Sequence, residues 1–154
     1  MEQDALSAAL EREHREIDEG IAASVAAESG TGGIAALTGA LTALRRHIYL
    51  EEELLFPSLR DQLVAPLFVM LREHGQMWST MAELEKALAD EDEASVREVR
   101  AVLMSQLDTH NGKEEPIIYP YADTALPAEQ AARLREFLAS GDIPAGWTCH
   151  AARA

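Results

Sequence analysis

The sequence has one cysteine, few aromatic residues and far fewer basic than acidic residues. A lone Cys149 cannot form a disulfide within the chain, which fits a reducing compartment. Lysine and arginine number 13 against 27 aspartates and glutamates, so the formal net charge is −14. This balance argues against a nucleic-acid backbone or an anionic membrane surface as partner.

Long hydrophobic runs are also missing. The N-terminal MEQDALSAAL carries acidic residues where a secretory signal carries basic ones, and no apolar run follows it. The longest stretch without charge, residues 29–44, is short and rich in Gly, Ala and Thr, so it does not resemble a membrane span. We therefore expect a soluble cytoplasmic protein.

The composition that is present is typical of helices: Ala, Leu and Glu are abundant and β-branched runs are few. Apolar residues recur with a helical period in four long segments, at about residues 3–28, 34–60, 66–89 and 94–116. A shorter helix is expected at about 127–139. Short connections make neighbouring helices antiparallel, so the sequence predicts an all-α fold, an up-down-up-down four-helix bundle with a short fifth C-terminal helix.

The length of 154 residues fits one domain with a single core. We assign residues 1–142 to the bundle and 143–154 to an irregular C-terminal tail, which has no apolar period. The Gly-rich residues 29–33 are expected to form the turn after the first helix. Cys149 and His150 are expected on a mobile end. A peroxide-sensitive thiol is the alternative for Cys149.

Each long segment carries one histidine on its apolar stripe, and two of these are followed by a glutamate four residues later. Residues four apart share a helix face, so these side chains should project into the bundle interior. The set comprises His14, His47, Glu51, His74, His110 and Glu114.

A single histidine on an apolar stripe is more often a hydrogen-bonded core residue, and a single His-x-x-x-Glu pair commonly lies on a helix surface. Four such histidines with two carboxylates are harder to explain in this way. An uncompensated buried carboxylate costs several kcal/mol or becomes protonated. The nearby basic residues Arg45, Arg46, Arg72 and Lys113 point elsewhere by helical phase. We infer a multivalent metal cation among these side chains.

The candidate ligands occur in two copies of one pattern. HIYLEEELLFP at 47–57 and HNGKEEPIIYP at 110–120 share His, three residues, Glu-Glu, three residues, an aromatic residue and Pro. Arg-Glu-His at 12–14 recurs at 72–74. Two similar hairpins about a pseudo-twofold axis would each supply two imidazoles and one carboxylate. That arrangement fits two metal ions bridged by two carboxylates better than it fits one ion.

Neighbouring residues are expected in lesser roles. Glu52 and Glu115 follow the predicted ligand glutamates and are turned off the ligand face, so they should be solvated or support the ligands from outside. Phe56 and Tyr119 lie within two turns of the site, and core packing is the favoured role for both.

In these motifs the sequence resembles the hemerythrin-like family, the HHE cation-binding domains, over about residues 5–123. The resemblance implies a non-haem di-iron centre beside an oxo or hydroxo group. It assigns His14, His47, His74 and His110 as terminal ligands and Glu51 and Glu114 as bridges. Ligand type alone also admits zinc, copper or manganese. A ferritin-like di-iron bundle uses Glu-x-x-His pairs with several extra glutamates, and it is rejected because Glu13-His14 and Glu73-His74 do not have that spacing.

The sequence departs from the oxygen-carrying hemerythrins at two places. Residue 78 is Trp where they have a fifth histidine, and Glu114 follows His110 at a shorter spacing than theirs. Six protein ligands would leave both irons an open or water-filled position. The resemblance therefore favours bacterial di-iron proteins that handle hydrogen peroxide or nitric oxide, including those linked to iron–sulfur cluster repair.

Three functions stay open at this point. The first is a redox enzyme that acts on a small oxidant or diatomic gas under oxidative or nitrosative stress, by catalase-like or nitric oxide chemistry, with an unidentified reductant. The second is a non-catalytic module that senses or stores oxygen, nitric oxide or iron. The third is a structural bundle with a satisfied polar core. The oligomeric state is open.

Overall fold

The computed structural model describes residues 4–27 and 31–153. Within these residues the chain is helical and has no strand, which confirms the all-α prediction. The elements are α1 (Leu6–Ala27), α2 (Thr31–Leu50), a π-helical turn η1 (Glu51–Leu55), α3 (Phe56–Leu59), α4 (Val64–Ala89), α5 (Glu93–Ile117), α6 (Tyr119–Thr124), α7 (Ala128–Ser140) and a 3-10 turn η2 (His150–Ala152). None of the described helices is long and apolar enough to cross a membrane.

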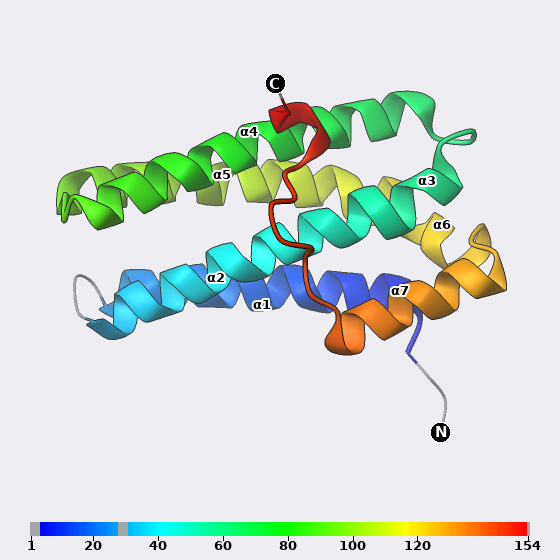
Figure 1. The fold of residues 1–154 in the computed structure, drawn as a ribbon, viewed down its shortest axis with the longest axis horizontal. Helices are drawn as coiled ribbons and strands as arrows, with labels where there is room; N and C mark the ends of the chain where they lie inside the picture. Colours follow the sequence, from blue (N-terminus) through cyan, green and yellow to red (C-terminus); the bar gives the residue numbers. More distant parts are fainter. Residues whose placement is uncertain (1–3, 28–30, 154) are drawn as a thin grey trace.

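Two long helical hairpins lie side by side (Figure 1). α1 packs along α2, and α4 packs along α5. The π-helical turn and α3 continue α2, while α6 follows α5 and contacts α1. α7 packs against η1 and α2, after which the chain crosses α2 and ends on α4 (Figure 1).

The helix boundaries agree with the sequence-based ones within a few residues, apart from the second segment. Its predicted continuous helix is divided by the π-helical turn, and residues 31–33, predicted as part of a turn, begin α2. The structure does not describe residues 1–3, 28–30 and 154. These include both ends of the predicted first helix, the start of the predicted turn at 29–33 and the last residue of the predicted tail. Asp92 caps the N-terminus of α5: its side chain accepts a hydrogen bond from the Ser95 N–H.

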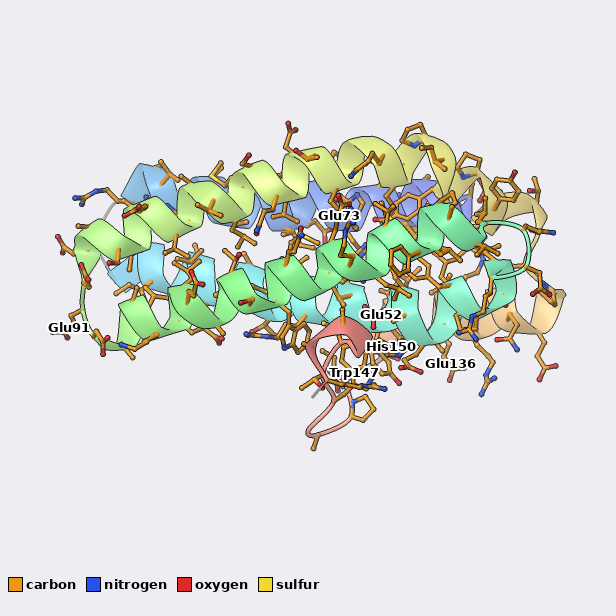
Figure 2. All side chains as sticks on the ribbon, turned by 90° about the horizontal axis from the view of Figure 1, so that it is seen from above. Glu52, Glu73, Glu91, Glu136, Trp147 and His150 are labelled. Carbon is orange, nitrogen blue, oxygen red and sulfur yellow. The ribbon has the colours of Figure 1, made fainter. Side chains whose placement is uncertain are left out.

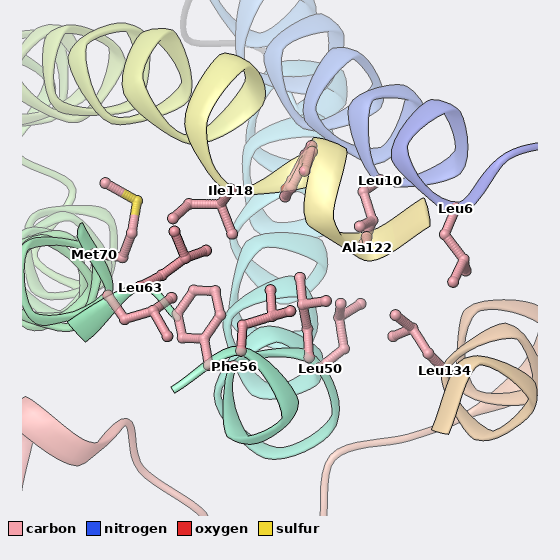
Figure 3. Packing of buried hydrophobic residues seen from close by; sticks show 13 residues of the cluster. Leu6, Leu10, Leu50, Phe56, Leu63, Met70, Ile118, Ala122 and Leu134 are labelled. Carbon is pink, nitrogen blue, oxygen red and sulfur yellow. The ribbon is translucent and has the colours of Figure 1, made fainter. Parts of the chain in front are cut away.

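Two apolar clusters fill the bundle, and the predicted ligands lie in a polar layer between them. The first cluster gathers where α3, α6 and α7 meet, with Leu6, Leu10 and Leu134 among its members (Figure 3). The second includes Ile17 from further along α1. On α1, His14 therefore lies between the two clusters, and on α4 His74 lies between Met70 of the first cluster and Met77 of the second. The apolar period thus sets both the core and the height of the polar layer.

The C-terminal tail is irregular but is packed, contrary to the expectation of a loose, mobile end. Cys149 is 0% exposed and belongs to the second cluster. Trp147 packs edge-on against Trp78 and Tyr49, with ring centroids 5.6 and 5.0 Å away. These contacts come from single residues rather than from a repeating stripe, so a period search does not reveal them.

The buried thiol is expected to be unreactive. Burial, together with the charge of Glu52, raises the pKa of Cys149 to about 11 from an ordinary value of 9.0. The thiolate fraction at pH 8 should then be about 100-fold lower in the folded than in the unfolded chain. We expect a thiol reagent to modify Cys149 slowly in native protein, with a rate that rises about tenfold per pH unit, and quickly in denaturant. Equal native and denatured rates would contradict the packed tail.

Candidate metal centre

The six predicted ligands come together as two groups that share both glutamates. The first group is His14, His47, Glu51 and Glu114, and the second is His74, His110, Glu51 and Glu114. In each group the candidate ligand atoms lie within 4.8 Å of one another. All six side chains are at most 3% exposed. Four helices therefore deliver six buried donors to one small volume.

Each shared glutamate directs one oxygen to each group. Glu51 Oε2 lies 3.5 Å from His47 Nε2, and its Oε1 lies 3.1 Å from His74 Nε2. Glu114 Oε1 lies 3.1 Å from His14 Nε2, and its Oε2 lies 3.4 Å from His110 Nε2. A carboxylate with one oxygen on each side can contact two cations at once.

The π-helical turn explains how two consecutive glutamates both face inward. Its i→i+5 hydrogen bonding includes the Phe56 N–H donating to the Glu51 carbonyl. Such a turn is wider than a regular α-helical one and is frequent at functional sites. Glu51 and Glu52 are both buried here, although a regular helix would rotate the second off the ligand face. Glu52 therefore contacts a candidate ligand rather than solvent.

Each histidine presents Nε2 to the centre and Nδ1 to a glutamate outside the ligand set. The Nδ1-to-oxygen distances are 2.8 Å for His14 and Glu115, 2.9 Å for His47 and Glu13, 2.7 Å for His74 and Glu52, and 3.0 Å for His110 and Glu73. A metal-binding histidine almost always donates its other ring N–H in this way, which fixes the ring and raises its basicity. All four rings are thus oriented for coordination through Nε2.

Glu13 and Glu73 are site residues that the sequence did not single out. They occupy equivalent positions in the repeated Arg-Glu-His triplets, and each reaches a histidine on the neighbouring helix. The triplet repeat was the available signal. Outside them, Arg46 Nη1 lies 3.0 Å from Glu13 Oε2, and Lys113 Nζ contacts Glu73. Arg46 and Lys113 therefore balance Glu13 and Glu73 and do not contact the shared carboxylates.

Ring protons would balance part of the buried negative charge in protein that has no metal bound. Burial would lower the pKa of His47, but the charge of Glu51 and hydrogen bonds with Glu13 and Glu51 raise it to about 10. Burial would also lower the pKa of His74, but its hydrogen bonds with Glu51 and Glu52 raise that pKa to about 9. Burial would raise the pKa of Glu114, but the charge of His110 holds that pKa well below its usual range. A metal ion that binds at neutral pH has to displace ring protons.

One buried oxygen lacks a hydrogen bond and supports a cation at this place. Glu114 Oε2 has no hydrogen-bond partner among the described residues, and its approach to His110 Nε2 is long. Leaving a buried carboxylate oxygen unsatisfied is costly, whereas contact with a cation would offset that cost. Imidazole and carboxylate donors suit iron, zinc, copper and manganese. The residues present therefore fit a paired metal centre.

Tyr119, for which the sequence favoured core packing, points into the first group. Its buried hydroxyl lies 2.8 Å from His14 Nε2 and 2.9 Å from His47 Nε2. It is also 2.9 Å from Glu51 Oε2 and 3.0 Å from Glu114 Oε1. Phe56 occupies the same position in the other copy of the motif and has no hydroxyl. Its ring stacks on the ring of His74 beside the second group, so the two halves of the centre differ chemically.

The sequence model of the hemerythrin HHE cation-binding domain matches residues 5–122. The chain belongs to this family. No curated protein and no solved structure shows a significant match. The matched range of the hemerythrin domain contains both His/Glu groups, whereas α7 and the C-terminal tail lie beyond it. The predicted resemblance is thus confirmed, and a cation-binding role follows from the family.

Proposed function

We propose that this hemerythrin-like protein holds two metal ions, iron by the family resemblance, and that the pair binds or reacts with hydrogen peroxide, nitric oxide or oxygen. The observation that carries the proposal is the direction of the shared carboxylates, each with one oxygen on each ligand group. His14 and His47 would hold the first ion, His74 and His110 the second, and Glu51 and Glu114 would bridge them. We include in this proposal the oxo or hydroxo group that the resemblance implies beside these bridging glutamates.

A bound iron pair would supply the redox chemistry. The chain's own residues orient the donors and control what reaches them. Carboxylates at the four Nδ1 atoms hold the imidazoles, and apolar clusters on both sides of the polar layer exclude bulk water. Tyr119 brings a hydroxyl to the first group, where it can donate a hydrogen bond to a small oxygen-containing ligand.

This hydroxyl favours turnover over simple storage. A sensing or storage module needs the ligands and an access route, but has no need of a hydrogen-bond donor beside them. A phenol held within 3.0 Å of four candidate ligand atoms can donate a hydrogen bond to peroxide bound beside it, and it keeps its proton because burial and the charges of Glu114 and Glu51 raise its pKa well above the ordinary value. We therefore place peroxide decomposition first and reversible binding or sensing of nitric oxide or oxygen second.

The test is peroxide consumption by iron-loaded protein, compared with the same concentration of free iron. Wild-type protein should consume many equivalents faster than free iron. Tyr119→Phe should retain its iron but turn over about tenfold to a hundredfold more slowly, because it lacks only the hydrogen bond from the hydroxyl. A rate no higher than that of free iron would remove the catalytic proposal. A reversible spectral change with nitric oxide, without turnover, would then support the binding module.

The remaining expectations are part of the same proposal. The up-down-up-down helix order is supported by the antiparallel course of the neighbouring helices in Figure 1. The net charge of −14 supports the expectation that neither nucleic acid nor an anionic membrane is a partner. The lone cysteine supports the proposed cytoplasmic location, and the proposed role under oxidative or nitrosative stress rests on the resemblance.

A further inference from the structure

The end of the chain contacts the second ligand group through a buried glutamate. His150 lies close to Glu52 on the turn that rests against the bundle (Figure 2). The backbone N–H of His150 donates to Glu52 Oε1 at 2.8 Å, and His74 Nδ1 donates to Glu52 Oε2 at 2.7 Å. Both oxygens of this buried carboxylate are thus occupied, one by the tail and one by a candidate ligand.

The equivalent carboxylate in the other half has no such support. Glu115 occupies the same position of the repeated motif as Glu52, and its Oε2 lies 2.8 Å from His14 Nδ1. Its side chain is 35% exposed, and its Oε1 has no hydrogen bond within residues 4–27 and 31–153. The ligand set is therefore doubled, but the outer contact that fixes the carboxylate is present on only one side.

Several contacts hold the tail at this place. Trp147 Nε1 and His150 Nε2 lie 3.1 and 2.9 Å from the same oxygen of Glu53. A β-carbon on Gly75 would lie only 2.7 Å from the Ala151 β-carbon, so glycine directly after His74 allows the tail to lie on α4. With Cys149 buried in the second cluster, the tail is positioned from α2, α4 and the core together.

We propose that residues 147–153 of the tail form a positioning element for the second metal position and make the two positions unequal. Fixing Glu52 at both oxygens fixes the ring of His74, while Glu115 leaves His14 more freedom. Loss of the group that holds a metal-binding histidine typically costs about 10- to 100-fold in metal affinity, and releasing Glu52 from the tail should weaken the second position in the same way. The inference rests on the proposed two-metal centre and adds that the ion at His74 and His110 is the more firmly held of the two.

Two substitutions at residue 150 separate the backbone contact from the side chain. His150→Pro removes the N–H that reaches Glu52. Proline is compatible with this place because Cys149 is extended, with φ −63° and ψ 153°, and residue 150 begins a helical turn. His150→Ala keeps the N–H and removes only the ring, so it is the matched control. Gly75→Ala displaces the tail from the α4 side without touching residue 150.

The experiment is release of both metals to a chelator, followed in time. Wild type and His150→Ala should release one ion quickly and one slowly. In His150→Pro and Gly75→Ala the slow phase should become about 10- to 100-fold faster, with the fast phase unchanged. Identical release from the Pro and Ala variants, or equal acceleration of both phases in His150→Pro, would overturn the proposal.

A measurement on metal-free protein keeps this inference separate from the proposed function. The ring nitrogen signals of His74 should shift in His150→Pro by nuclear magnetic resonance, while those of His14 stay in place and the melting temperature changes little. If wild-type protein binds fewer than two ions, the proposed function fails, and the ring signals still decide the role of the tail. Unchanged His74 signals would show that the tail does not position this ring.

Discussion

Replacing Glu51 or Glu114 with alanine is expected to abolish the paired centre and lower the metal content from about two ions per chain to fewer than one. Each of these carboxylates has an oxygen on both ligand groups, so one truncation removes a ligand and a negative charge from both metal positions. The histidines alone would leave two divalent cations close together with too little negative charge between them. Elemental analysis of the purified variants measures the loss directly.

The controls are glutamates that lie outside the ligand set. Glu16 on α1 is exposed, so Glu16→Ala should retain the wild-type metal content. Glu52 is buried but contacts His74 rather than the centre itself, so Glu52→Ala should weaken the second ion and keep the first. Equal loss of metal from the Glu51, Glu114 and Glu52 variants would refute the distinction between shared ligands and outer carboxylates.

Removal of both metal ions from fully loaded wild-type protein is expected to lower the melting temperature by about 20 °C. Each ion that binds only the folded chain contributes about 4 kcal/mol at a free concentration 1,000 times its dissociation constant, so two ions contribute about 8 kcal/mol. For a domain of this size each kcal/mol corresponds to roughly 2–4 °C. Thermal unfolding with and without a chelator, followed by circular dichroism, provides the measurement.

The same scan on a variant without the centre is the control for the chelator itself. Glu114→Ala should melt at the same temperature with and without chelator, because it has little metal to lose. The metal-free wild type should still fold, since protons on His47 and His74 offset part of the buried charge. A loaded wild-type protein whose melting temperature did not change on chelation would favour a purely structural polar core.

Periodicity and motif repetition predict much of this molecule because both follow from which face of a helix is buried. The positions of the long helices and the inward direction of the six candidate ligands depend only on the helical period within each segment. The pairing of Glu51 with Glu114 follows from the duplicated motif. These features need no knowledge of how one helix contacts the next.

The features that were missed depend on contacts across helices or on local irregularity. Glu13 and Glu73 act on histidines of neighbouring helices, so their own helical phase does not reveal them. The inward side chain of Glu52 requires the π-helical turn, for which the sequence has no clear signal. Tyr119 and Phe56 occupy equivalent motif positions, yet only the tyrosine hydroxyl can reach a ligand group.

The central claim is that one chain holds a pair of irons between four histidines and two shared glutamates. The most direct test is the metal content per chain, with each element identified, after purification from an iron-replete preparation. We predict about two irons per chain. A single ion per chain, zinc in place of iron, or no bound metal would contradict the di-iron centre.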